Sequence, residues 1–80
     1  MLKEELEQTI VELVCKYNEQ PYDAQLKDQP IVNFRLDSVN AVSIVSDLEK
    51  KLDTELFPTL FWEFDTISEM TDWIIERGEG

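Results

Sequence analysis

The sequence predicts an all-α domain: a four-helix bundle with three longer helices, one short third helix and a long loop between helices one and two. A chain of 80 residues is long enough for one domain only. Its two glycines and three prolines leave little material for the turns of a β-sandwich or barrel. Its apolar residues recur at helical spacings. Hydrophobic residues make up 42% of the chain, which is more than a disordered chain carries. We therefore expect residues 1–80 to form a single domain.

The first helix is expected between Leu2 and Tyr17, where apolar residues recur every three or four positions. An advance of about 100° per residue places them on one stripe. The stripe comprises Leu2, Leu6, Ile10, Leu13, Val14 and Tyr17. Val11 and Cys15 fall beside it, so we expect Cys15 to be a small, partly covered apolar residue.

Residues 18–37 show no apolar period and contain Pro21 and Pro30, which predicts a long loop. Loops of this length are uncommon in compact domains and often functional. Four apolar residues are expected to hold its second half on the core: Ile31, Val32, Phe34 and Leu36.

The second helix is expected to start at Asp37 and Ser38, which are both good N-cap residue types, and to end near Leu52. A helical projection gathers its core-facing residues into one arc. The arc comprises Ala41, Val42, Ile44, Val45, Leu48 and Leu52. Val39 lies outside the arc, beside the polar face and next to Ser38, so we expect it to be exposed.

A short third helix is expected over residues 59–64, with Pro58 in its first turn. This segment carries Phe61, Trp62 and Phe64, which together with Trp73 suggest either core packing or an acyl-binding pocket or partner surface. We expect core packing, because aromatic side chains dominate the cores of small domains. At least one tryptophan is expected to reach the surface.

The last helix is expected to begin at Thr66, which forms a capping box with Glu69, and to end at Gly78. Its apolar face comprises Ile67, Met70 and Ile74, with Trp73 at the flank.

The net charge of -11, spread along the chain, works against binding to nucleic acid or to an anionic membrane. It favours protein partners with basic surfaces, because complementary potentials steer encounter. The same charge is equally explained as keeping a small protein in solution.

Composition also argues against an enzyme and a metal site. No histidine is present to act as a general base, and Cys15 is the single cysteine, which excludes an internal disulfide and zinc sites built from Cys and His. The ladder of acidic residues around a glycine that calcium requires is absent. No export signal or membrane span follows Met1, so we expect a cytoplasmic protein.

Ser38 is the candidate for chemistry. At the amino end of a helix its hydroxyl would lie near unpaired N–H groups and the positive end of the helix dipole, which favour an attached phosphate. The alternative is that Asp37 and Ser38 are only an N-cap pair. Val39 favours the first interpretation, because an exposed apolar residue beside the hydroxyl offers a contact to a docking partner.

Two segments resemble acyl carrier proteins. The run Phe34-Arg35-Leu36-Asp37-Ser38-Val39 is similar to the Asp-Ser-Leu attachment motif of that family. Residues 56–67, LFPTLFWEFDTI, resemble the Leu-Pro-x-Thr-Leu-x-Phe-Asp-Tyr-Pro-Thr-Ile pattern of carrier domains in polyketide synthases. The resemblance covers nearly the whole chain and is closest to a free-standing carrier of the polyketide-synthase type.

This resemblance implies that a phosphopantetheinyl transferase attaches 4′-phosphopantetheine to Ser38, with Asp37 as the preceding motif residue. The thiol of the group would carry acyl intermediates as thioesters in polyketide, fatty-acid or related specialised biosynthesis. The other expected partners are acyl-loading and acyl-processing enzymes with basic or apolar docking surfaces. They would contact helix two of a monomeric carrier at Val39, Asp47 and Glu49.

The chain departs from the family pattern at several positions. Family members usually have glycine in place of Arg35, leucine in place of Val39 and proline in place of Asp65, while Asn40 and Ser43 occupy places that are often acidic.

Two alternatives stay open. One is an acidic helical interaction module without a prosthetic group. The other is an aminoacyl or peptidyl carrier, ranked lower because such carriers usually show Gly-Gly where this chain has Phe34-Arg35.

Overall fold

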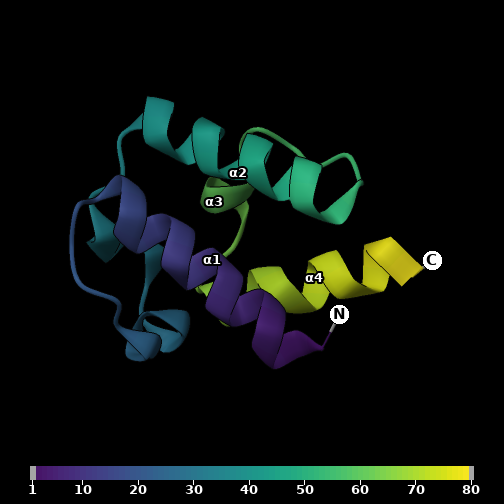
Figure 1. Ribbon diagram of the computed structural model, residues 1–80, viewed down its shortest axis with the longest axis horizontal. Helices are drawn as coiled ribbons and strands as arrows, with labels where there is room; N and C mark the ends of the chain where they lie inside the picture. The colour runs from purple at the N-terminus through teal and green to yellow at the C-terminus, as the bar shows by residue number, and fades with distance from the viewer. Residues whose placement is uncertain (1, 80) are drawn as a thin grey trace.

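The computed structural model describes residues 2–79, which form α-helices and 3-10 helices and contain no strand. The order is α1 (Lys3–Tyr17), the 3-10 helices η1 (Ala24–Asp28) and η2 (Ile31–Phe34), α2 (Ser38–Leu52), α3 (Leu60–Glu63) and α4 (Ile67–Glu79) (Figure 1). The predicted all-α bundle with three longer helices and a short third one is confirmed. Within residues 2–79 no helix is both long and apolar enough to cross a membrane.

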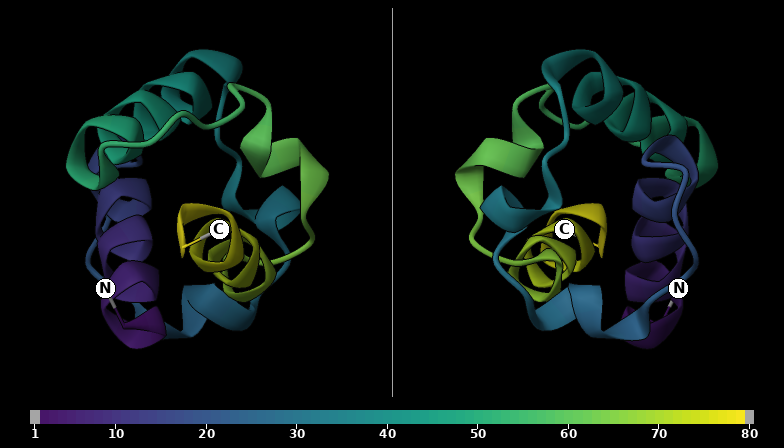
Figure 2. Two further views of the ribbon diagram at one scale, coloured as in Figure 1. Left: turned by 90° about the vertical axis from the view of Figure 1, so that its right-hand side faces the viewer. Right: turned by 90° about the vertical axis from the view of Figure 1, so that its left-hand side faces the viewer.

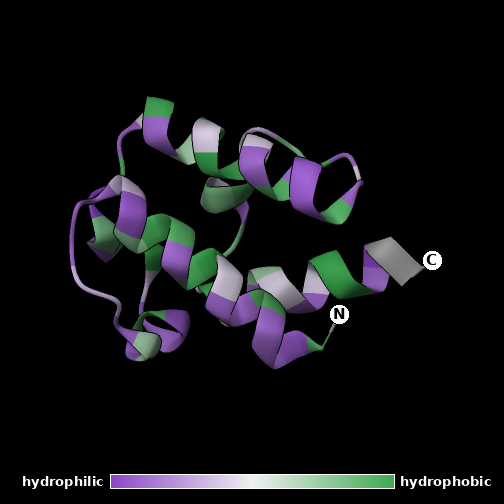
Figure 3. Ribbon diagram, viewed as in Figure 1, coloured by the Kyte–Doolittle hydropathy of each residue, from purple (hydrophilic) through white to green (hydrophobic). Residues whose placement is uncertain are grey.

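The helices surround one apolar core. Viewed along the long axis of the molecule, α1, α2 and α3 lie around α4, and η1 and η2 close the remaining sides (Figure 2). Along each long helix, segments coloured as hydrophobic alternate with segments coloured as hydrophilic (Figure 3). The largest fully buried apolar side chains are Leu6, Ile10, Val11, Val14, Ile44, Val45, Leu48, Leu60, Ile67 and Met70.

The predicted stripe of α1 is largely confirmed, since Leu6, Ile10, Leu13 and Val14 are buried. Tyr17 is half-buried against the core. The prediction for Leu2 is wrong: its side chain is 69% exposed. Leu2 lies in extended backbone at the N-cap position, before the helical turn that faces the core.

A second side of α1 is also buried, contrary to the sequence prediction. Val11 and Cys15 are 1% and 4% exposed. Near Val11 this side faces η1, which packs against both α1 and α4. A surface cavity between α1 and η1 is lined by Val11 together with Ala24 and Lys27. The covering element therefore comes from the segment that the sequence indicated only as a loop.

Two residues fix this loop segment on the bundle. Ile31 and Phe34 of η2 are buried as expected, and Leu36 is half-buried. The backbone N–H of Ile31 donates a hydrogen bond of 2.8 Å to the carbonyl oxygen of Asp65. The prediction for Val32 is wrong, because its side chain is 86% exposed.

Helix α2 has the predicted bounds, and its core-facing residues Ala41, Ile44, Val45 and Leu48 are buried. Leu52 is half-buried against the core, as expected for the last turn. Val42 was expected in the buried arc, and this is wrong: it is 44% exposed, because it lies at the edge of the arc.

The third helix is shorter than predicted. Pro58 and Thr59 form a turn ahead of α3 rather than its first turn, and Phe64 follows it in extended backbone. Phe61 is buried and Phe64 partly buried, while Trp62 is 56% exposed. The expectation of core packing is therefore wrong for Trp62, whereas the expectation that a tryptophan reaches the surface is confirmed.

Helix α4 begins as expected, since the Thr66 hydroxyl oxygen accepts a hydrogen bond of 3.2 Å from the backbone N–H of Glu69. Ile67, Met70 and Ile74 are buried. The prediction that Gly78 ends the helix is wrong, because the helix continues to Glu79.

An aromatic cluster joins α4 to the segments on either side of α3. The ring of Trp73 lies 5.7 Å from that of Phe57 and 5.8 Å from that of Phe64, centroid to centroid. The guanidinium of Arg77 lies 5.5 Å from the Phe57 centroid and 5.3 Å from the Trp73 centroid. Such contacts combine apolar packing with cation–π attraction.

Candidate functional site

Ser38 is the first residue of α2, and its side chain is exposed. The N-cap is Asp37, whose carboxylate accepts a hydrogen bond of 2.8 Å from the backbone N–H of Asn40. The Asp37 carbonyl oxygen accepts a second bond, from the N–H of Ala41. Asp37 alone therefore caps the helix, and within residues 2–79 no hydrogen bond engages the Ser38 hydroxyl.

The backbone around Ser38 presents positive partial charge. The first turn of a helix leaves N–H groups without helical partners, and the aligned peptide dipoles add to them. Asp37 satisfies one of these groups, at Asn40. The groups at the very start of α2 remain near the Ser38 side chain, in the arrangement that binds phosphate at helix N-termini.

The chain enters α2 through a left-handed residue. Arg35, which follows η2, has φ 57° and ψ 36°. Glycine adopts this region at the least energetic cost, because it has no Cβ. The amide of Asn18 donates a hydrogen bond of 2.9 Å to the carbonyl oxygen of Phe34, which fixes the end of η2 to the end of α1. The backbone that leads to Ser38 is therefore fixed by the hydrogen bond between Asn18 and Phe34 and by the helix cap at Asp37.

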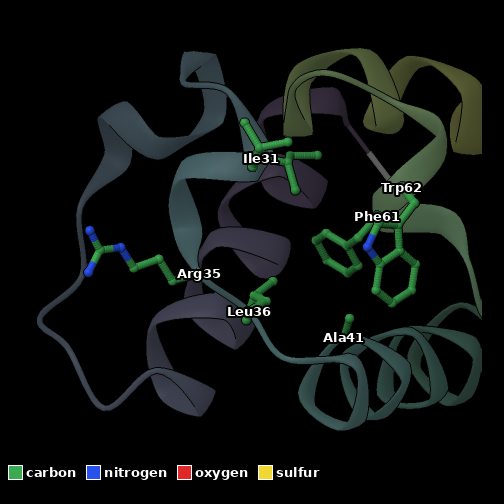
Figure 4. Close-up of a pocket in the computed structure, with 7 residues that line it drawn as sticks. Ile31, Arg35, Leu36, Ala41, Phe61 and Trp62 are labelled. Atoms are coloured by element: carbon green, nitrogen blue, oxygen red, sulfur yellow. The ribbon is translucent and has the colours of Figure 1, made fainter.

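An apolar cavity of about 230 Å³ lies between η2, α2 and α3. Its lining residues are Ile31, Val32, Arg35, Leu36, Ala41, Phe61 and Trp62. Figure 4 shows Phe61 and Trp62 on one side, Ala41 below them and Ile31 and Leu36 opposite, while the guanidinium of Arg35 points away from the others. The side chains that face the cavity are therefore apolar, and the cavity borders the first turn of α2 at Ala41.

The predicted contact residue Val39 is 74% exposed, so its position beside Ser38 on the surface is confirmed. In Figure 3, the start of α2 carries a segment coloured as hydrophobic next to one coloured as hydrophilic.

Asp47 and Glu49 are both engaged within the protein. The Tyr17 hydroxyl donates a hydrogen bond of 2.8 Å to Asp47 Oδ2, and this bond, assisted by burial and by the negative charge, raises the pKa of Tyr17. Glu49 Oε2 accepts a bond of 3.0 Å from the backbone N–H of Leu56. Sequence reasoning missed both bonds because their partners lie 30 and 7 residues away in the chain.

Comparison with known families identifies the family of the chain. The family described as "Phosphopantetheine attachment site" matches residues 8–74. The chain belongs to this family of carrier domains. Carriers of this family bear 4′-phosphopantetheine on a serine and are not themselves catalytic. Family membership also rules out the alternative of an interaction module without a prosthetic group.

One relative is a polyketide synthase. The carrier is 37% identical over 49 residues to "Polyketide synthase PksR" of Bacillus subtilis (strain 168). The match covers 61% of the carrier and 2% of the synthase. No solved structure matches the chain.

The carrier contains four serines, which differ in their settings. Ser43 and Ser46 lie inside α2, and Ser68 is the second residue of α4; all three are partly buried. Ser38 is the exposed one and the one that starts a helix. The Ser38 hydroxyl is exposed and makes no hydrogen bond in the described chain, and it lies at a helix N-terminus, which favours phosphate. These properties fit a covalently attached phosphopantetheine.

Proposed function

We propose that Ser38 is the attachment residue for 4′-phosphopantetheine and that the chain is an acyl carrier of polyketide biosynthesis. The observation that supports this most is that Asp37 caps α2, so the exposed hydroxyl of Ser38 has no structural role to give up. A serine that served as the cap would lose its stabilising bond on modification.

The residues around Ser38 suit the group in three ways. The Ser38 oxygen would become one ester oxygen of the phosphodiester, and the start of α2 would stabilise the negative charge of the phosphate. The apolar cavity beside it gives an apolar substituent a place to leave water. When bound, the group supplies a flexible arm whose thiol holds acyl groups as thioesters. The arm raises the effective concentration of the acyl group at each docked enzyme.

The acyl assignment rests on sequence. The similarity to a polyketide synthase supports a polyketide role, and fatty-acid or related specialised biosynthesis is the neighbouring alternative. An aminoacyl or peptidyl carrier is disfavoured, because the Phe34-Arg35 pair stands where such carriers usually have Gly-Gly.

The proposed partners are a phosphopantetheinyl transferase and the enzymes that load and process the acyl group. We propose α2 as their docking element, with Val39 as the apolar contact and Asp47 and Glu49 as secondary acidic contacts, since each carboxylate keeps accepting capacity beyond its internal bond. A monomeric, cytoplasmic carrier is consistent with the single buried, unpaired Cys15.

Intact-mass spectrometry tests the assignment of Ser38. Incubation with coenzyme A, Mg²⁺ and a phosphopantetheinyl transferase of broad specificity should add one phosphopantetheinyl group to the wild-type chain. Ser38→Ala should abolish the addition, and Ser68→Ala, a serine in the first turn of another helix, should not. A folded wild-type chain that stays unmodified, or a Ser38→Ala chain that is still modified, would refute the proposal.

A further inference from the structure

We propose that a groove between α1 and α2 binds an acidic segment of a partner protein through Lys16, Lys50 and Lys51. This lysine groove has a volume of about 510 Å³ and is lined by side chains from residues 9–16 of α1 and residues 47–51 of α2. The inference goes beyond the proposed function, because it assigns a second binding surface whose net charge is opposite to that of the carrier as a whole. It does not depend on which serine is modified.

The lysine groove concentrates positive charge on an acidic chain. Three of the seven basic residues of the chain line it, together with the two carboxylates of Glu12 and Asp47. Its net charge is therefore +1, and the rest of the chain carries -12 of the total of -11. At physiological salt the Debye length is about 8 Å, so distant carboxylates act only weakly on a ligand in the groove. A local positive surface of this kind favours an anionic partner.

The lysines of the groove are not neutralised within the described chain. Among residues 2–79 the one ion pair joins Lys3 Nζ to Asp72 Oδ1 at 3.0 Å, so Lys16, Lys50 and Lys51 form none. All three are exposed. The helix dipoles favour basic residues in the last turns of α1 and α2, but they do not require these residues to line a common groove. Flexible stems let the three ammonium groups turn toward carboxylates from outside.

The two carboxylates of the groove are engaged by neutral donors instead of by the lysines. Glu12 Oε1 accepts a hydrogen bond of 3.0 Å from Gln8 Nε2, one helical turn earlier in α1. Asp47 Oδ2 accepts the bond of 2.8 Å from the Tyr17 hydroxyl. Because these bonds hold the carboxylates without an ion pair to a lysine, the lysine N–H donors stay available to an external acceptor.

The dimensions of the groove suit a short peptide segment. In Figure 1, α1 and α2 run in roughly opposite directions. The bond between Tyr17 and Asp47 brings the end of α1 beside Asp47, which places Lys16 near one end of the groove and Lys50, three residues after Asp47, toward the other. At about 1.5 Å per residue, residues 9–16 span about 10 Å, which equals the spacing of side chains seven residues apart on one face of a partner helix.

The lysine groove lies away from Ser38. An advance of about 100° per residue puts Asp47 about 180° and Lys50 about 120° from Ser38 around the axis of α2. Lys50 also lies about 18 Å further along the helix. A segment bound in the groove therefore leaves the Ser38 hydroxyl accessible, so a partner could hold the carrier there while another enzyme acts at Ser38. Such tethering raises the effective concentration of the carrier at its enzymes.

The test is a titration of the full chain, labelled with nitrogen-15, with a synthetic helical peptide that carries glutamates at i, i+4 and i+7. Backbone amide shifts should concentrate in residues 9–16 and 47–51. Exposed ion pairs are individually weak, so we expect a Kd of about 0.1 to 2 mM. A peptide with glutamine in place of each glutamate should cause no shifts. Saturation with the acidic peptide should leave the rate of modification of Ser38 unchanged.

Substitutions separate the groove from the overall charge of the chain. Replacement of Lys16, Lys50 and Lys51 by glutamine should raise the Kd of the acidic peptide about two- to threefold for each lysine and about tenfold in the triple variant. Arg35→Gln removes one exposed positive charge outside the groove and should change the Kd by less than about 1.5-fold. Circular dichroism verifies that each variant keeps its helix content.

Several results would overturn the inference. The first is the absence of shifts at about 5 mM acidic peptide, a concentration well above the expected Kd. The second is a triple variant that binds as the wild type does, or an equal loss in Arg35→Gln, since either would assign binding to the overall charge. The third is inorganic phosphate that shifts the same amides and displaces the peptide at equal concentration, which would indicate a general anion site.

The last two results concern other occupants and the place of the groove. A dimer of the free chain in analytical ultracentrifugation that the triple variant abolishes would show that a second copy fills the groove. A peptide that blocks modification would show that the groove is not separate from Ser38. Each of these results leaves the assignment of Ser38 intact, whereas failure of the chain to be modified without peptide contradicts that assignment and not the lysine groove.

Discussion

Replacement of Asp37 by alanine tests the division of roles at the start of α2. The Asp37 carboxylate accepts the Asn40 N–H at 2.8 Å, and this is the one side-chain cap of a 15-residue helix. Loss of a side-chain cap costs about 1 kcal/mol, and loss of a negative charge at a helix N-terminus costs about 0.3 to 1 kcal/mol more at low salt. We expect Asp37→Ala to lower the free energy of unfolding by about 1 to 1.5 kcal/mol.

Urea unfolding followed by far-ultraviolet circular dichroism measures this change at constant m-value. The corresponding fall in Tm is about 4 to 8 °C for each kcal/mol in a domain of this size. Asp37→Asn keeps an acceptor oxygen and should cost only about 0.5 kcal/mol. Ser38→Ala should cost less than about 0.5 kcal/mol, because its hydroxyl makes no bond in the described chain.

Two results would refute this reasoning. A neutral Asp37→Ala would mean that the bond to Asn40 does not stabilise the helix. A Ser38→Ala variant that is as unstable as Asp37→Ala would mean that Ser38 is the cap, and the argument that its hydroxyl is free for modification would fail.

Three further substitutions probe features elsewhere in the fold. Tyr17→Phe removes the bond to Asp47, which raises the pKa of Tyr17. The contribution of this bond is present below about pH 10 and is lost as pH rises through the raised value, so the difference in urea midpoint between wild type and variant should shrink as pH rises above about 10. A pH-independent difference would contradict this assignment. Arg35→Gly should raise the free energy of unfolding by about 0.5 to 1 kcal/mol, because glycine tolerates φ 57°, and a destabilised variant would count against left-handed strain. Arg77→Ala should lower it by about 0.5 to 1 kcal/mol through loss of the contact with Trp73, and Arg77→Lys by less; equal values for the two would argue against stacking.

The long helices were predictable because their patterns are local. In α1, α2 and α4 the apolar residues repeat at helical spacing, and the burial of residues such as Ile10, Ile44 and Met70 follows directly. Helix caps are local as well, so Asp37 and Thr66 could be recognised from the residues that follow them.

What the sequence did not reveal depends on neighbours distant in the chain. Val11 is buried where η1 packs against α1, and a 3-10 helix of five residues is too short to show a period. The exposed position of Val32 depends on the turn of η2, in which neighbouring residues face different sides.

The candidate site also has a part that could be predicted from neighbouring residues and a part that could not. The position of Ser38 at a helix start followed from adjacent residues, whereas the cavity beside it requires η2, α2 and α3 to be brought together. The internal bonds of Asp47 and Glu49 likewise appear only when α1 and the α2–α3 connection are in place. A helical projection alone assigns both carboxylates to the solvent.

The two tryptophans lie in settings that differ enough to make them independent fluorescent reporters. Trp73 packs against Phe57 and Phe64 beneath the Arg77 guanidinium, so its emission should shift to the red when the bundle unfolds. Trp62 is 56% exposed beside the cavity, so its emission should shift to the blue when another molecule covers it. Chains that carry Trp62→Phe or Trp73→Phe would therefore give separate optical signals for unfolding of the bundle and for contact at the cavity between η2, α2 and α3.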